Sequence, residues 1–217
     1  EWLAAKAVMD GAVTISGDNY PERYVDFGRD PNLTVTMTGQ GAWNGTDADP
    51  MTDINAWLLT AYRAKFGGAL TRMTCGVEAY QALIQDQRVQ DELKLDIRGT
   101  QVNLNRGIVP GVEAQYMGTL GSGLEVWMYR DYYEDENGTL TEFMDPRDVV
   151  LTGNVDGVRA FGAILDRRAG LRAMPIFPKM WDEEDPSATY LMSQSAPLMV
   201  PVYQNQTMRA RVIDSGL

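Results

Sequence analysis

Two runs of carboxylates are the residues in this sequence that could most readily do chemistry. Hydrolysis of a glycosidic bond needs two carboxylates held a few ångströms apart. Both runs adjoin aromatic residues, Tyr132 and Tyr133 in one case and Trp181 in the other. A carbohydrate-active enzyme is therefore one hypothesis, and it predicts that the two runs meet across one cleft. The acids are Asp131, Glu134, Asp135 and Glu136 in the first run, and Asp182, Glu183, Glu184 and Asp185 in the second.

The placement of these acids in the sequence favours a plainer interpretation. Each run is contiguous and lies beside turn-forming residues, where acidic side chains usually serve turn formation and solubility. Neither run matches a calcium-binding EF-hand loop, which needs alternating acids and a distal Glu. We therefore expect residues 131–136 and 182–185 to be solvated.

The sequence offers few other groups for catalysis. It contains no His, the commonest general base and zinc ligand. Its single cysteine, Cys75, follows an apolar stretch and is predicted to be a buried structural thiol. The loop Gly121-Ser122-Gly123 lacks the trailing Lys and Ser or Thr of a phosphate-binding loop. We predict no catalytic, cofactor-binding or metal-binding residue, and no cofactor.

The charge of the chain argues against tight binding to nucleic acid. The formal net charge is −11. The sequence has two short clusters of basic residues: one is Arg167, Arg168 and Arg172, and the other is Arg209 and Arg211. Proteins that bind phosphate backbones need clustered Lys and Arg. We interpret both basic groups as solvated loop and strand faces. Since no apolar run approaches the roughly 20 residues that span a bilayer, no membrane partner is expected.

The first half of the chain alternates between helical and extended patterns. Asp49-Pro50 is a strong helix start, and an apolar stripe from Ile54 to Phe66 extends the predicted helix to Gly67-Gly68. Other helices are predicted at Glu1–Met9, Val77–Ile84 and Gln87–Leu95, and strands at Val13–Ser16, Tyr24–Phe27, Leu33–Met37 and Leu70–Cys75.

From Val112 onward the pattern is mostly that of strands. Gly121-Ser122-Gly123 and Asn137-Gly138 are predicted hairpin turns, because tight hairpins need positive φ angles. The predicted strands are Val112–Leu120, Leu124–Tyr133, Asp148–Leu151, Gly157–Leu165, Tyr190–Val200 and Thr207–Ile213. Together the patterns predict a mixed α and β protein.

Several motifs resemble one known family. The most specific is Pro178-Lys179 and Trp181, then Asp185-Pro186, then Gln194-Ser195-Ala196-Pro197-Leu198-Met199. This order is similar to the C-terminal part of the phage major capsid protein E family. Three further segments agree in order and spacing: Val25-Asp26-Phe27-Gly28-Arg29; Trp43 with Asp49-Pro50 and Asp53-Ile54; and Val149-Val150-Leu151 with Gly153-Asn154 and Arg159-Ala160-Phe161-Gly162.

The resemblance implies an α+β fold of the Hong Kong 97-like phage capsid type. Such a subunit has a peripheral domain, built on a spine helix and a long β-sheet, and an axial domain of mixed sheet and helices. Residues 1–50 would be a peripheral segment that starts with the end of the spine helix. Residues 51–177 would be the axial domain, and residues 178–217 would return to the peripheral sheet. The family's N-terminal arm and extended loop would lie upstream of Glu1.

The implied function is that of a major capsid protein of a tailed phage or prophage. Such a protein self-assembles without covalent bonds into an icosahedral shell around the DNA genome, and is not an enzyme. Its partners would be copies of itself in hexamers and pentamers, with decoration, scaffold and portal proteins as further candidates, and DNA only by enclosure. It would be found in the virion capsid, and in the bacterial host cytoplasm before assembly. A tail or adhesion binding module is the alternative besides the enzyme.

The resemblance also gives the segment Pro178–Val200 a role. We expect Trp181–Pro186 to be a polar crossover that leads into one long strand. That strand, over Leu191–Val200, is expected to be extended and to pack near the helix at Glu1–Met9.

Overall fold

The structure is a computed structural model that describes residues 2–17, 20–95, 113–135 and 137–216. Its main body is built on a six-stranded mixed sheet with the strand order β3-β14-β9-β4-β6-β5. The strands are β3 (Thr34–Thr36), β14 (Thr207–Arg211), β9 (Asp148–Thr152), β4 (Arg72–Cys75), β6 (Glu125–Tyr129) and β5 (Ala114–Thr119). Pairing is parallel for β14 with β3 and for β4 with β6, and antiparallel elsewhere.

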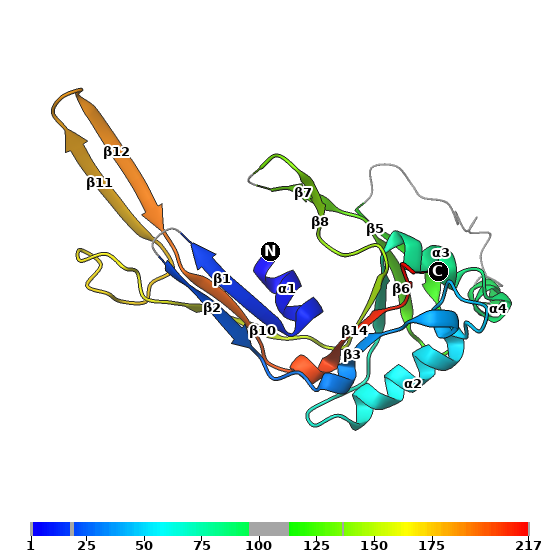
Figure 1. Cartoon of the computed structure of the whole chain (residues 1–217). Coiled ribbons are helices and arrows are strands. Elements are labelled where there is room, and N and C mark those ends of the chain that lie inside the picture. Colours follow the sequence, from blue (N-terminus) through cyan, green and yellow to red (C-terminus); the bar gives the residue numbers. More distant parts are fainter. Residues whose placement is uncertain (1, 18–19, 96–112, 136, 217) are drawn as a thin grey trace.

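One face of this sheet is apolar because alternate residues of each strand point to the same side. Met73 and Cys75 of β4, Val149 and Leu151 of β9, and Met208 of β14 are completely buried in one cluster. Three helices contribute side chains to the same cluster: α2 (Pro50–Arg63), α3 (Val77–Leu83) and α4 (Gln87–Leu95). The main core of the protein therefore lies between these helices and the sheet (Figure 1).

The other part of the molecule is elongated and extends away from the body (Figure 1). It contains helix α1 (Trp2–Asp10) and three two-stranded antiparallel ribbons. These pair β1 (Ala12–Gly17) with β2 (Tyr20–Asp26), β10 (Gly157–Phe161) with β13 (Pro197–Pro201), and β11 (Phe177–Glu183) with β12 (Ala188–Gln194). Strand β13 and helix α1 are neighbours.

A further hairpin projects from the body itself. It pairs β7 (Tyr132–Glu134) with β8 (Leu140–Glu142), and Gly138 in its turn has the positive φ of 77° that the Asn-Gly pair predicted. Short 3-10 helices lie at Pro31–Leu33, Gly39–Gly41 and Gln204–Gln206.

Most predicted elements are present, but several have other bounds; the strand predicted at Gly157–Leu165, for example, is β10 and ends at Phe161. Helix α2 ends at Arg63 and not at Gly67-Gly68. The predicted strand Leu124–Tyr133 is two strands, β6 and β7, separated at Arg130-Asp131. The strand predicted at Val112–Leu120 corresponds to β5, which covers Ala114–Thr119. Its predicted first residue, Val112, lies outside the described residues.

A further correction concerns Pro178–Val200. Trp181–Glu183 is not a crossover but the end of β11, and the expected long strand is two strands, β12 and β13, separated at Ser195-Ala196. The expectation that this segment packs near the first helix is confirmed for β13 only. The six-stranded sheet draws strands from all three predicted segments of the chain, so their division into domains stays a prediction.

Candidate functional site

The two acidic runs lie in different parts of the molecule. Asp131 and Asp135 flank β7 on the hairpin above the body, whereas Asp182 and Glu183 lie near the far end of the β11–β12 hairpin (Figure 1). The remaining acid of the first run, Glu136, lies outside the described residues. The prediction that the runs meet across one cleft is therefore wrong, and the enzyme hypothesis loses its site.

The described acids of these runs act locally. Oδ1 of Asp135 accepts hydrogen bonds from the backbone N–H groups of Asn137 and Thr139, both at 2.8 Å. Oδ1 of Asp182 accepts one from the hydroxyl of Thr189 at 2.7 Å. These are the turn-forming and strand-pairing roles expected of acids beside turns.

Two further chemical expectations can be compared with the structure. The Cys75 side chain is completely buried, and burial raises the pKa of its thiol to about 12, so it stays protonated at neutral pH. Within the described ranges, no group of three or more His, Cys, Asp or Glu side chains could hold a metal ion. No helix of the described chain is long and apolar enough to cross a membrane.

An arginine and aspartate network lies on the sheet face opposite helices α2, α3 and α4. Arg211 is directly opposite Asp148 in the antiparallel pair of β14 and β9, so both side chains point to the same side. The Asp148 side chain is only 2% exposed, and its oxygens accept hydrogen bonds from Nε of Arg209 at 2.7 Å and Nε of Arg211 at 2.8 Å. The prediction that Arg209 and Arg211 are solvated is wrong, since carboxylates pair with both.

A second carboxylate extends the network toward the end of the sheet. Asp145 accepts from Nε and Nη2 of Arg147 at 2.9 and 2.8 Å, and from Nη2 of Arg211 at 2.7 Å. The hydrogen bond from the Arg147 side chain is the main reason that the pKa of Asp145 falls to about 2. Hydrogen bonding to Asp148 in turn raises the pKa of Arg211. Asp145 and Arg211 are therefore both charged at neutral pH.

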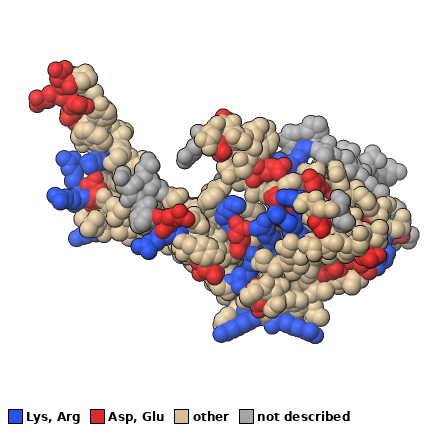
Figure 2. Space-filling view, in the orientation of Figure 1, with Lys and Arg blue, Asp and Glu red and all other residues tan. Residues whose placement is uncertain are grey.

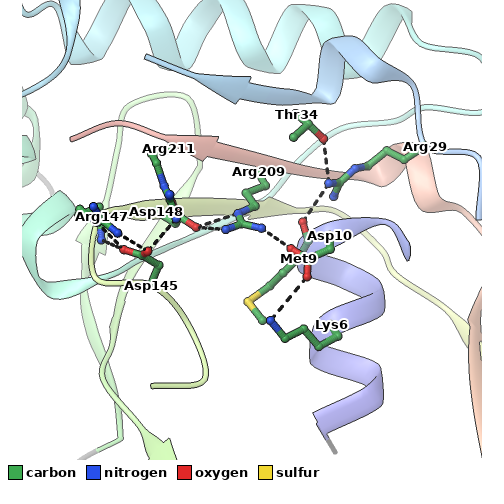
Figure 3. Close-up of polar contacts among 10 residues, drawn as sticks. All are labelled: Lys6, Met9, Asp10, Arg29, Thr34, Asp145, Arg147, Asp148, Arg209 and Arg211. Atoms are coloured by element: carbon green, nitrogen blue, oxygen red, sulfur yellow. Dashed lines mark hydrogen bonds and ion pairs between the residues drawn. The ribbon is translucent and has the colours of Figure 1, made fainter. Parts of the chain in front are cut away.

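The network reaches helix α1 through Asp10. Arg209 binds Asp10 as well as Asp148, and so links α1 to the sheet (Figure 3). Arg29 holds the same end of the helix, because its guanidinium donates to the carbonyls of Val8 and Met9 at 3.0 and 2.9 Å. These carbonyls are among the four that an α-helix leaves unpaired at its C-terminus.

Arg29 is itself fixed by its surroundings. It also donates to the Thr34 hydroxyl at 2.9 Å, and burial lowers its pKa to about 10. Gly11 follows the helix with a φ of 68°, and a Cβ there would lie 2.9 Å from Nε of Arg29. Glycine thus satisfies both the left-handed turn and the close approach of the guanidinium.

We call the contacts of α1 with Arg29 and Arg209, together with Asp145, Arg147, Asp148 and Arg211, the joint. A hollow of about 810 Å³ opens beside it, between the end of α1, the base of the β7–β8 hairpin and residues 213–215. Among the residues that line it, Arg147 and Arg209 pair with Asp10, Asp145 and Asp148, the Asp214 carboxylate accepts from the backbone N–H groups of Gly39 and Gly216, and no cysteine or histidine is present. The joint is suited to hold two parts of the molecule together, and not to activate a nucleophile.

The β11–β12 hairpin, which we call the arm, is largely exposed. None of its residues is fully buried, and Met180 and Leu191 are 61% and 80% exposed. Trp181 stacks on Tyr190 with ring centroids 5.3 Å apart, on the opposite face of the arm. A two-stranded hairpin is at best marginally stable alone in water, so such a surface is typical of a contact with another molecule.

Sequence reasoning missed the arm as a hairpin. The signal was available, because Phe177–Glu183 and Ala188–Gln194 flank Glu184-Asp185-Pro186-Ser187, four residues typical of turns. The joint offered no such signal, because its members come from four distant stretches of chain.

Comparisons with known proteins agree on one family. The model of the family described as phage major capsid protein E matches residues 1–212. The major capsid protein of Escherichia phage lambda is 31% identical over 211 residues, and that of Enterobacteria phage P21 is 30% identical over 215 residues. In both cases the alignment covers 92% of this chain and 59% of the relative, so the chain spans about three fifths of their length.

A solved structure shares the fold. The crystal structure described as a capsid protein of a prophage of E. coli CFT073 superposes with a TM-score of 0.73 at 25% sequence identity. The match covers 98% of this chain and 62% of that one.

Proposed function

The chain belongs to the phage major capsid protein E family and has its Hong Kong 97-like fold, and on this premise we propose that it is part of a shell-forming major capsid protein. The whole protein, from a tailed phage or prophage, would self-assemble without covalent bonds into an icosahedral shell around the DNA genome. The observation that carries this proposal is the family match over residues 1–212.

The role that we propose is structural and not catalytic. A shell protein must bury large surfaces against copies of itself, often 2,000 Å² or more. The arm supplies exposed apolar side chains for such contacts, and the joint supplies a fixed attachment for α1. The separated acidic runs leave the carbohydrate-active alternative without a paired site.

The partners follow from the same proposal. They are copies of the chain in hexamers and pentamers, with decoration, scaffold and portal proteins as further candidates. DNA would be enclosed by the shell and not bound tightly by the chain, because a net charge of −11 disfavours binding to phosphate groups. The protein would pass from the bacterial host cytoplasm into the virion capsid. Within the subunit, residues 1–50 and 178–217 would form the peripheral domain and residues 51–177 the axial domain.

Electron microscopy tests the proposal. The longer protein that contains this chain, expressed with its scaffold, is expected to form capsomer rings or closed shells. Circular dichroism and thermal unfolding would establish that the sample is folded. A folded protein that stays monomeric at high concentration would contradict the proposal.

A further inference from the structure

The arm presents an apolar face that the described chain leaves open. Met180 and Leu191 are directly opposite each other in the β11–β12 register, so their side chains share one face. They are 61% and 80% exposed. The opposite face carries the stacked Trp181 and Tyr190, and Lys179 there binds Asp166 at 2.6 Å.

The base of the arm lies against an ordered, basic loop formed by residues 162–176, which we call the basal loop. The Lys179–Asp166 pair and a 2.7 Å hydrogen bond from Ser195 Oγ to the carbonyl of Pro175 attach this loop to the arm. Ile164 is buried, and its N–H donates to the carbonyl of Arg172 at 3.1 Å, which closes the loop on itself. Its exposed side chains are of two kinds, the basic Arg167, Arg168 and Arg172 and the apolar Leu165, Leu171 and Ile176.

The two ends of the arm have opposite charges. Asp182, Glu183, Glu184 and Asp185 are exposed at its far end, and Figure 2 shows the separation of this acidic tip from basic side chains near the base. Strands rise about 3.3 Å per residue, so seven-residue strands place the tip roughly 20 Å from the base. That separation exceeds the screening length of about 8 Å at physiological salt, so tip and base cannot neutralise each other within one copy.

The described part of the chain gives the basic side chains of the basal loop no ion pair in their own copy. Among the described residues, neither Arg167, Arg168 nor Arg172 forms an ion pair, and the same holds for the four acids of the tip. An apolar centre with a charged rim is the usual composition of a protein interface. The arm and the basal loop both have this composition, and their charged side chains have opposite signs.

From these observations we propose that the arm of one copy docks on the basal loop of a second copy. Met180 and Leu191 would cover Leu165, Leu171 and Ile176, and the acidic tip would approach Arg167, Arg168 and Arg172 of the second copy. Because tip and base are different surfaces, the contact is head-to-tail and closes a ring when the rotation between copies allows it. This inference rests on the proposed self-assembly, and adds which surfaces meet.

Charge reversal tests the contact in the longer, assembling protein. Glu183→Lys with Glu184→Lys, and separately Arg167→Glu with Arg168→Glu, should each weaken association by about tenfold or more, because like charges would then face each other. Combining all four substitutions should restore association to within about threefold of the unmodified protein, because the pairs would be complementary again. Sedimentation velocity at physiological salt provides the measurement.

A matched control keeps the overall charge change but moves it elsewhere. Asp47→Lys with Glu113→Lys also replaces two exposed acids, on the body and away from the arm. This variant should associate like the unmodified protein. If it loses association as strongly as the tip variant does, or if the four-fold variant is not restored, the proposed contact is wrong.

Cross-linking supplies a second readout that does not depend on association strength. Copies carrying Glu184→Cys and copies carrying Arg168→Cys should form a mixed disulfide in assembled particles, while the buried Cys75 stays unreacted. Pairing Glu184→Cys with Glu113→Cys is the control. Equal yields from the two pairs would overturn the inference.

The outcomes separate the two proposals. If rings or shells form equally well in every variant and no mixed disulfide appears, another partner covers the arm, and only the head-to-tail contact fails. If the unmodified longer protein forms neither rings nor shells, the proposed capsid function itself fails.

Discussion

At the scale of single residues, Asp148 is the centre of the joint. Two arginines converge on one nearly buried carboxylate, with side chains that are 28% and 33% exposed. Removing one member of such a group leaves the charges of the others without compensation. Asp148 should therefore matter more for stability than any of the exposed acids.

The substitution Asp148→Asn tests this. It should lower the free energy of unfolding by about 2–3 kcal/mol, less than for a fully buried ion pair because the arginines are partly hydrated. Urea denaturation followed by tryptophan fluorescence measures the change. Asp47→Asn, on the surface, should change it by no more than about 0.5 kcal/mol. Equal effects of the two substitutions would contradict the central role of Asp148.

Asp145 makes the stability depend on pH. Its pKa is lowered from 3.8 to about 2 in the folded chain, mainly by the hydrogen bond from Arg147. A carboxyl with a depressed folded pKa stabilises the fold above its unfolded pKa, and this contribution is lost as the pH falls through the folded value. The affected window therefore runs from about pH 4 down to about pH 2.

The variant Asp145→Asn removes this titration. Its unfolding free energy should fall less steeply than that of the unmodified chain as the pH is lowered through this window. Urea denaturation at a series of pH values gives both profiles. Two parallel profiles would show that Asp145 is not stabilised in its charged form.

At the scale of elements, helix α2 shows which helix signals were reliable. Its start was predicted correctly because the signal is local: Asp49 accepts a 3.1 Å hydrogen bond from the N–H of Thr52, and Pro50 follows. Its end was wrong because the apolar stripe continues past the helix. Phe66 adopts a φ of 57°, and a Cβ at Gly67 would lie 2.0 Å from the Ala61 carbonyl oxygen. The chain therefore turns back sharply, and Phe66 is 73% exposed.

The helix start offers a graded test. Asp49→Ala should destabilise the protein by about 1 kcal/mol, because it removes the capping oxygen. Asp49→Asn keeps an oxygen for the Thr52 N–H and loses only the exposed ion pair with Arg88, so its cost should be about 0.3 kcal/mol. Chemical denaturation distinguishes the two. If both variants lose the same stability, the ion pair and not the cap determines the effect.

At the scale of the whole molecule, local patterns predicted most elements but not how they assemble. The hairpin turns at residues 121–123 and 137–138 and the α3 and α4 helices follow from turns and periodicity within about ten residues. The joint does not, because Asp10, Asp148 and Arg209 are brought together only by the sheet and α1. The hairpin of the arm could have been predicted from its turn residues, but the exposure of its apolar side chains could not, because Met180 and Leu191 resemble residues of a core strand in the sequence.

The position of β14 has a consequence for the synthesis of the protein. This strand, Thr207–Arg211, lies between β3 and β9 and is hydrogen-bonded to both. Strand β3 therefore has no neighbour in the sheet until residue 211 has left the ribosome, although it is made some 170 residues earlier, or roughly 10–35 s at about 5–20 residues per second. Helices α2–α4 and strands β4, β6 and β9 can pack together during translation. The charge of Asp148, however, has no ion-pair partner in β14 until Arg209 and Arg211 have been synthesised. The nascent chain therefore carries β3 unpaired, and once β9 has been made it also has an open sheet edge at β9, until β14 emerges. Unpaired strands and open edges are the parts most exposed to chaperones and to wrong strand pairing.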